Sequence, residues 1–304
     1  MDIAMPLNRR QILSAAAGAA LATTVNSKPT RADDLPKSDA GLSVVKNGRI
    51  RQSIMGWCFK PMPIEQLAQH CRAIGLVAME GIGREYYPAV RDLGLKISLV
   101  GSHGFQRGVC DAEQHDYCEK TLREAIDVAV AVDCPSVITF TGMLKPGQDR
   151  DEAERNCIAG WKRVIGYAEE KKINLCLEHL NTRDDTHPMK GHPGYFGDDV
   201  DHCVRMIEQI GSPRMKLLFD IYHVQIMNGD VIRRIRQYKD VIGHYHTAGV
   251  PGRGELDDKQ EVNYPAVMQA ILDTGYEGFV AQEFIPTWAD PIAALRHAAG
   301  VCDV

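Results

Sequence analysis

The chain has 304 residues, of which 44% are hydrophobic and 25% are charged. This balance excludes an intrinsically disordered chain, a collagen-like chain and a small disulfide scaffold. Acidic residues outnumber Lys and Arg by 40 to 35, and the net charge is −5. Because an acidic molecule repels phosphate, we expect no nucleic-acid partner.

Residues 1–32 have the features of an export signal. Arg9 and Arg10 precede an Ala-rich apolar stretch, and no further charge occurs before Lys28. A basic start, a short apolar middle and small residues are typical of a secretory signal. The paired arginines favour the twin-arginine route, so we expect export to the periplasm. The alternatives are an amphipathic helix or a membrane anchor.

After this segment we expect a linker over residues 33–49 and one folded domain over residues 50–304. No run in the domain approaches the roughly 20 apolar residues of a membrane span, so we expect no membrane contact after signal removal. The nine cysteines include no Cys-x-x-Cys pair. We therefore expect buried free thiols rather than disulfides or a zinc cluster.

Short apolar runs alternate with helical patterns along the folded domain. Each run is too short for a helix and is bounded by Gly, Pro or polar residues. The predicted strands are Ser53–Trp57, Val77–Gly81, Lys96–Val100, Ser136–Thr141, Asn174–Glu178, Lys216–Asp220, Ile242–Thr247 and Gly278–Glu283. The predicted helices cover residues 63–74, 84–93, 115–131, 149–171, 199–210, 229–238, 264–273 and 289–300.

Eight strand–helix alternations predict parallel strands covered by helices, and eight strands close into a barrel. The alternative is an open doubly wound sheet, which would usually carry a Gly-rich phosphate turn after its first strand. That position reads Trp57-Cys58-Phe59-Lys60-Pro61, without glycine. The sequence therefore favours an α/β fold that is a single (β/α)8 TIM barrel.

Charged residues end several of the predicted strands. Because catalytic residues of such barrels lie at the C-terminal ends of the strands, these residues are expected to face one mouth. A like-charge pair about 4 Å apart costs about 4 kcal/mol at an effective dielectric constant near 20. Protons or a cation must relieve that repulsion. The residues in question are Glu80, Glu178, Asp220, His246 and Glu283.

One divalent cation held by Glu178, Asp220, His246 and Glu283 satisfies this requirement. Three carboxylates and one imidazole suit Mn²⁺ or Mg²⁺, and also Co²⁺ or Zn²⁺. His244 and His246 lie on the same face of their predicted strand. His246 is nearer the C-terminal end and is the predicted ligand, whereas His244 lies deeper or supports it.

At these positions the chain resembles the xylose-isomerase-like barrel superfamily, and most closely its hydroxypyruvate isomerase branch. The resemblance implies that Glu178, Asp220, His246 and Glu283 bind the metal and that Glu178 and Glu283 also act as acid/base residues. It further implies that His223 and Arg253 contact substrate oxygens. The segments that carry the resemblance are Leu177–Arg183, His192–Phe196, Phe219–His223, Gly243–Arg253 and Gln282–Phe284.

Two features separate the chain from hydroxypyruvate isomerases. Those enzymes tend to have Gln where this chain has His246, and ketose 3-epimerases of the superfamily have His. Residues 184–191 also lengthen the loop after the fifth predicted strand. Arg253 lies in a loop of surface-like composition, so the alternative to substrate contact is a solvated arginine. Three aromatic residues are candidates to wall a sugar or, alternatively, to pack in the core or at the rim, namely Trp57, Phe105 and Tyr195.

The expected reaction is proton transfer next to a carbonyl in a small sugar or hydroxy-keto acid, through an enediolate. Return of the proton to the neighbouring carbon gives an isomerase, and return to the opposite face of the same carbon gives an epimerase. Other readings are a non-catalytic periplasmic sugar-binding barrel and a three-zinc nuclease barrel. Barrels of this kind often pair, so a homo-oligomer is also considered.

Overall fold

The structure is a computed structural model that describes residues 43–304. The predicted signal segment 1–32 and residues 33–42 of the predicted linker lie outside the described residues. Export by the twin-arginine route therefore stays a prediction. Within the described residues, no helix is both long and apolar enough to cross a membrane.

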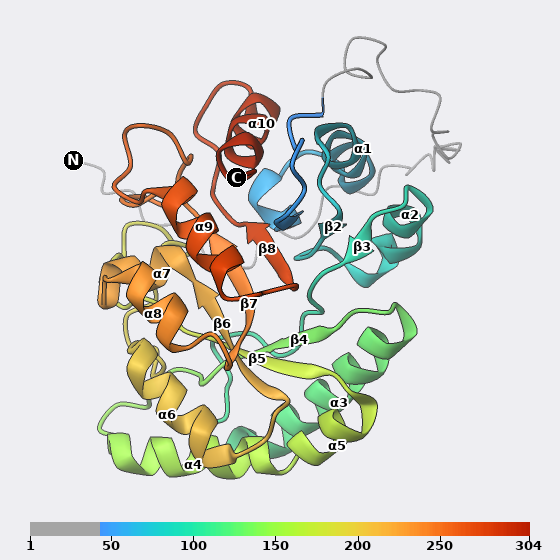
Figure 1. Ribbon diagram of the computed structural model, residues 1–304. Coiled ribbons are helices and arrows are strands. Elements are labelled where there is room, and N and C mark those ends of the chain that lie inside the picture. The colour runs from blue at the N-terminus through green and yellow to red at the C-terminus, as the bar shows by residue number, and fades with distance from the viewer. Residues whose placement is uncertain (1–42) are drawn as a thin grey trace, which may run out of the picture. The chain divides into compact units, whose positions relative to one another are not determined.

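Eight parallel strands alternate with helices along the chain (Figure 1). Each predicted strand is present, and most differ from the prediction by one to three residues at an end. The strands are β1 (Arg51–Ile54), β2 (Ala78–Met79), β3 (Lys96–Ile97), β4 (Ser136–Thr139), β5 (Asn174–Glu178), β6 (Met215–Asp220), β7 (Ile242–Thr247) and β8 (Phe279–Gln282).

The hydrogen-bonded ladder is continuous over six strands, in the order β1-β8-β7-β6-β5-β4, and β2 pairs with β3 in a separate short sheet. Isolated parallel bridges join the two sheets, between Met55 and Glu80 and between Val100 and Val137. This is the strand order of a TIM-barrel-like α/β fold. Strand β2 is shorter than the predicted strand Val77–Gly81. It ends early because Gly81, directly after Glu80, takes a left-handed φ of +62°.

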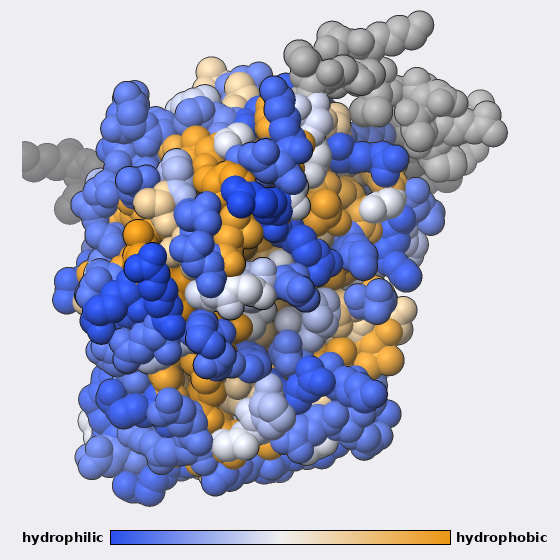
Figure 2. All heavy atoms as spheres, viewed as in Figure 1, coloured by the Kyte–Doolittle hydropathy of each residue, from blue (hydrophilic) through white to orange (hydrophobic). Residues whose placement is uncertain are grey.

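Helices form the outer layer around the strands (Figure 1). They are α1 (Ile64–Ile74), α2 (Tyr87–Asp92), α3 (His115–Ala131), α4 (Arg150–Lys162), α5 (Ile165–Lys171), α6 (Val200–Ile210), α7 (Ile221–Met227), α8 (Val231–Gln237), α9 (Tyr264–Asp273) and α10 (Pro291–Val301). Short 3₁₀ turns, η2 (Gly56–Phe59), η3 (Arg84–Tyr86) and η4 (Ala112–Gln114), precede α1, α2 and α3. Over the face seen in Figure 2, polar residues cover most of the surface and apolar residues show between them.

The predicted helix over residues 149–171 is in fact two helices, α4 and α5. The break lies at Arg163 and Val164, whose amides donate to carbonyls three residues back, Gly160 and Trp161. Such bonds tighten the last turn of a helix. The apolar stripe continues across the break, with Trp161 and Val164 both buried, so periodicity alone predicts one long helix.

Helix α7 was not predicted, because residues after Asp220 were expected to form a loop. The Asp220 side chain caps this helix by accepting hydrogen bonds from the backbone amides of Tyr222 (2.8 Å) and His223 (3.4 Å). An Asp at the N-cap stabilises a helix start by about 1 kcal/mol. One side chain therefore both ends β6 and starts the helix that carries His223.

All nine cysteines are free and buried, as the sequence predicts. Trp161 is among the largest fully buried side chains of the core. Its indole nitrogen donates to Thr139 Oγ1 at 3.0 Å, which joins α4 to β4. Buried indoles usually require such a partner.

We expect the Trp161→Phe variant to lose about 2 kcal/mol of unfolding free energy, because it removes a buried hydrogen bond and part of a packed ring. Urea denaturation followed by circular dichroism measures this. Trp288→Phe is the matched control, because Trp288 is partly exposed and its replacement should change stability by less than about 0.5 kcal/mol. Equal midpoints for Trp161→Phe and the wild-type protein would contradict the assigned contact.

Candidate metal centre and active site

The four predicted ligands come together at the carboxyl ends of adjacent strands. Glu178 ends β5, Asp220 ends β6, His246 lies one residue before the end of β7, and Glu283 directly follows β8. Asp220 and His246 are register partners, and the Glu283 amide donates to Thr247 O at 2.9 Å. One potential ligand atom from each residue lies within 4.8 Å of all the others.

The centre of this group holds buried polar atoms that are not satisfied by hydrogen bonds. His246 Nδ1 lies 3.3 Å from Glu178 Oε1 and 2.6 Å from Glu283 Oε2. All three atoms are buried, and none makes a hydrogen bond of acceptable geometry. Leaving such atoms unpaired costs about 1–3 kcal/mol each, more for charged groups. A shared cation would satisfy all three.

The pKa values of the four side chains show how the buried negative charge is accommodated when no cation is bound. Burial raises the pKa of Glu178, and the charge of Glu283 adds to the rise. Burial also raises the pKa of Asp220, to about 7. For Glu283 the effect of burial is outweighed by Arg253 and His246, which lower its pKa to about 2. For His246 burial alone would lower the pKa, but the surrounding carboxylates raise it well above its ordinary value.

His246 is therefore protonated at neutral pH when no cation is bound. Its Nδ1 proton lies where the carboxylates of Glu178 and Glu283 converge, and a divalent ion would replace that proton. Three hard oxygen donors and one imidazole fit Mn²⁺ or Mg²⁺, and the same set accepts Co²⁺ or Zn²⁺. The donor set thus fits the divalent ion that the sequence predicts.

Arg253 reaches into the centre of the site, although its sequence is typical of an exposed loop. Its guanidinium lies 3.3 Å from Asp220 Oδ2 and 2.6 Å from Glu283 Oε2, and the residue is only 2% exposed. It also donates to the backbone oxygen of Met189 in the long loop after β5. Its backbone takes a left-handed φ of 57°, which costs a non-glycine residue about 1–3 kcal/mol. The two ion pairs offset that cost.

His223 is buried beside Asp220, on α7 rather than in the predicted loop. Its Nδ1 accepts the backbone amide of Asn181 at 3.1 Å and lies 2.7 Å from the Asn181 side-chain nitrogen. Burial lowers the pKa of His223 well below its ordinary value, so the ring is neutral. Since Nδ1 accepts, the ring proton is on Nε2, which is buried without a hydrogen-bond partner 3.5 Å from Asp220 Oδ2. This N–H is free to donate to a substrate oxygen.

Glu80 is the main residue whose role the sequence did not assign. It lies inside the barrel after β2, where Oε1 is 2.8 Å from His246 Nε2 and Oε2 is 2.9 Å from His244 Nε2. Ser98 Oγ also donates to Oε2 at 2.5 Å. The two histidines outweigh burial and lower the pKa of Glu80. The available signal was its position at a strand end, together with the paired histidines.

The contact between Glu80 and His246 determines which ring nitrogen faces the candidate ion. A carboxylate that accepts from Nε2–H leaves Nδ1 as the metal-binding nitrogen and fixes the ring plane. Glu80, His244 and His246 also form a second group with ligand spacing. We interpret this group as the support of the first one, because Glu80 Oε1 already binds the Nε2 of the shared His246.

Asn181 and His192 also lie beside the candidate site, next to His223. Asn181 orients His223, and His192 lies against Phe105 with ring centroids 4.1 Å apart. Of the aromatic residues considered as sugar walls, Trp57 has its ring centroid 5.7 Å from the guanidinium carbon of Arg253. Tyr195 instead supports the core, because its hydroxyl donates to Glu178 O at 2.8 Å and accepts from the amide of Thr141.

The fold and the site define an α/β barrel with a carboxylate and imidazole cluster at the carboxyl ends of its strands. Residues 63–302 match the family described as xylose isomerase-like TIM barrel, and the chain belongs to that family.

Among curated proteins, the chain is 31% identical to a putative hydroxypyruvate isomerase of Homo sapiens over 65% of this chain and 73% of that protein. It is 27% identical to a 2-oxo-tetronate isomerase of Pectobacterium atrosepticum, over 59% of this chain and 68% of that one. These relatives support an enzyme of the isomerase or epimerase type.

Solved structures confirm the fold. An AP endonuclease of family 2 from Brucella melitensis aligns with a TM-score of 0.72 at 23% identity, covering 81% of this chain and 96% of that one. A 3-keto-D-glucoside 4-epimerase from E. coli aligns with a TM-score of 0.69 at 17% identity, covering 82% and 97%. At these identities the likeness concerns the fold alone.

We expect Glu80→Gln to weaken Mn²⁺ binding about 10- to 100-fold while the protein stays folded. The amide is uncharged and has only one acceptor oxygen, so it weakens the contact with His246 Nε2 that leaves Nδ1 facing the candidate ion. Titration calorimetry measures the affinity. Ser98→Ala is the matched control, because it removes one hydrogen bond to Glu80 but leaves Oε1 unchanged. Equal affinities for Glu80→Gln and Ser98→Ala would contradict the assigned role.

We also expect Mn²⁺ binding to release at least one proton per ion at pH 7, because the raised pKa keeps Nδ1 of His246 protonated until the ion displaces its proton. Asp220, whose pKa is raised to about 7, adds to the release. The apparent affinity should then rise with pH through neutrality, and the rise should continue above pH 7 because the pKa of His246 lies well above its ordinary value. Calorimetry in two buffers of different ionisation enthalpy counts the protons. The His246→Gln variant lacks the titrating ring and should release fewer protons. Equal proton release from both proteins would rule out His246 as the source.

Proposed function

We propose that the protein is a divalent-metal-dependent isomerase of a small 2-hydroxy carbonyl compound or sugar, acting by glutamate-mediated proton transfer through an enediolate. The observation that carries this proposal is the convergence of Glu178 and Glu283, with Asp220 and His246, on one buried point. The curated relatives, whose names are those of isomerases of hydroxypyruvate and 2-oxo-tetronate, support it.

In this mechanism one glutamate removes the proton from the carbon that carries the substrate hydroxyl. When bound, the cation supplies Lewis acidity that stabilises negative charge developing on the substrate oxygens. The other glutamate returns a proton, and the two exchange roles in the reverse direction. Glu178 and Glu283 both lie within 3.3 Å of the same His246 nitrogen, so both reach a substrate held at that point.

The remaining residues orient the substrate. Arg253 offers guanidinium donors that are now directed at Asp220 and Glu283. His223 offers one Nε2–H from the adjacent helix, in the tautomer that Asn181 fixes. Each group is buried and held by neighbours, so little ordering is needed when the substrate binds.

A ketose 3-epimerase is the second candidate. It is favoured by His246, since the epimerases of the superfamily have His where hydroxypyruvate isomerases tend to have Gln. Both activities use the same pair of glutamates and differ only in the carbon face or atom that receives the proton. Product analysis separates them, because isomerisation changes the position of the carbonyl and epimerisation changes one stereocentre.

The proposal extends to metal content and location. We propose one divalent ion per chain, whereas three zinc ions per chain would favour the nuclease reading. We also propose that the protein acts in the periplasm after twin-arginine export. Whether it forms a homo-oligomer stays a prediction that ultracentrifugation would test.

We expect Glu178→Gln and Glu283→Gln each to reduce turnover by more than about 100-fold. The assay is metal-dependent exchange of a carbon-bound proton with D₂O, screened over small keto acids, ketoses and aldoses. Glu154→Gln is the matched control, because Glu154 pairs with His202 between α4 and α6, away from the site. Near-wild-type exchange in both site variants would end this mechanism, and an absence of exchange with every substrate would favour a non-catalytic binder.

A further inference from the structure

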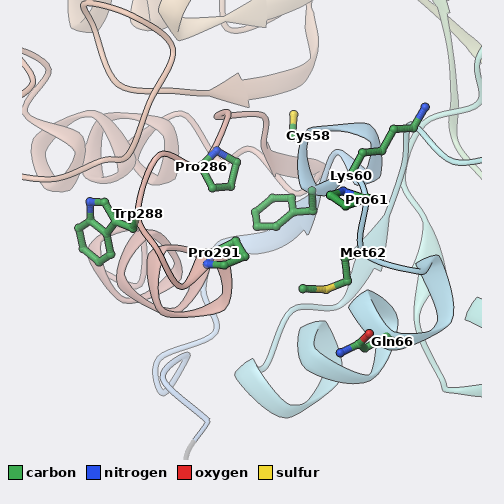
Figure 3. Close-up of a pocket in the computed structure, with 9 residues that line it drawn as sticks. Cys58, Lys60, Pro61, Met62, Gln66, Pro286, Trp288 and Pro291 are labelled. Carbon is green, nitrogen blue, oxygen red and sulfur yellow. The ribbon is translucent and has the colours of Figure 1, made fainter.

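A pocket of about 400 Å³ lies between the loop after β1 and the loop after β8, at the end of the barrel where the candidate site lies. Its walls come from Cys58 and Met62 on one side and from Pro286, Trp288 and Pro291 on the other (Figure 3). The volume falls within the range of about 300–1,000 Å³ typical of small-molecule sites. The mechanism proposed above uses none of these residues.

The lining is mostly apolar and contains the indole ring of Trp288 and several proline rings. Pro286, Pro291 and Trp288 lie near one another in Figure 3, and Gln66 of α1 contributes one amide. Trp288 is 37% exposed, and among the described residues only Val77 and Val130 are also large apolar residues with high exposure. A partly exposed tryptophan beside a pocket is typical of a binding surface, because its ring offers a large rigid apolar face.

The pocket adjoins the candidate active site. Cys58 forms part of its wall and is close enough to Glu283 and Arg253 for their charges to act on its thiol, whose pKa burial raises. The preceding residue, Trp57, lies beside the Arg253 guanidinium. On the other wall, the amide of Ile285 donates to Arg253 O at 2.7 Å. Each wall of the pocket therefore adjoins a residue that contacts Arg253, namely Trp57 on one side and Ile285 on the other.

The wall that carries Trp288 is held in place before any ligand binds. One carboxylate, Glu255, accepts the backbone amides of Thr287 at 2.5 Å and Trp288 at 2.9 Å, and the Thr287 hydroxyl at 2.8 Å. These hydrogen bonds outweigh the effect of burial and lower the pKa of Glu255, so the anchor is charged at neutral pH. A preformed wall reduces the entropy cost of binding.

We propose that this pocket binds a sugar ring attached to the reacting ketose, so that the preferred substrate is a glycosyl-bearing ketose rather than a free hydroxy-keto acid. This inference rests on the proposed function. A small substrate at the metal centre would leave the pocket unused, whereas a second ring can place its apolar C–H face on Trp288 and the prolines. Gln66 provides donors and an acceptor for hydroxyls at the edge of that ring.

The test compares three free ketoses that differ only at the far end: fructose, 6-O-glucosyl fructose and 6-O-benzyl fructose. Proton exchange in D₂O with Mn²⁺ gives kcat/KM for each. We expect the glucosyl ketose to exceed fructose by about tenfold or more. In Trp288→Ala that ratio should fall towards one, and in Val130→Ala, which removes exposed apolar surface on α3, it should stay as in the wild-type protein.

Equal kcat/KM for fructose and the glucosyl ketose would overturn the inference while leaving the proposed function intact. A preference for the benzyl ketose alone would also overturn it, in favour of an aromatic substituent. If no ketose exchanges protons, the proposed function fails, and titration calorimetry then tests the pocket separately. Tighter binding of the glucosyl ketose than of fructose, lost in Trp288→Ala, would still support the sugar-ring site, and equal binding would reject it.

Discussion

The structure is organised around the repulsion between carboxylates brought together out of water. Glu178, Asp220 and Glu283 end neighbouring segments of one parallel sheet, and geometry forces them towards a common point. In the protein alone this charge is balanced by protonated His246 and by Arg253, which pairs with Asp220 and Glu283. The balance is incomplete, since burial still raises the pKa values of Glu178 and Asp220. A divalent ion held by these residues would complete the neutralisation.

Glu80 connects this centre to the interior of the barrel. Its carboxylate accepts from His246 of β7 and from Ser98 beyond β3, and it lies 2.9 Å from Nε2 of His244. Ser98 in turn contacts Ser53 of β1. A charged residue at this depth is tolerated because it is fully paired. The same arrangement fixes the ring of His246. The orientation of the candidate ligand at the mouth therefore depends on the Glu80 side chain.

The sequence predicted that the four candidate ligands lie together at the strand ends, because the rule behind this prediction is simple. A charged residue at the end of an apolar strand needs a functional reason, and Glu178, Asp220 and His246 each lie in the strand the pattern predicts. The sequence failed where tertiary contacts override local composition. Arg253 has the neighbours of a surface loop, yet two carboxylates draw it into the interior. His223 was expected in a loop because capping by Asp220 depends on side-chain geometry that periodicity does not show.

Arg253 also links the loops that surround the site. Its guanidinium binds the backbone of Met189 in the long loop after β5, and its carbonyl accepts the amide of Ile285 in the loop after β8. Two residues further on, Glu255 holds Thr287 and Trp288. A substrate that draws the guanidinium away from Asp220 and Glu283 therefore alters its contact with the loop after β5, while the backbone contact with the loop after β8 is unaffected. Because the backbone of Arg253 is already in a left-handed conformation, a shift of the side chain about its own torsions costs less than a shift of the loop. This favours a site in which the arginine side chain moves between carboxylate and substrate while the loops keep their positions.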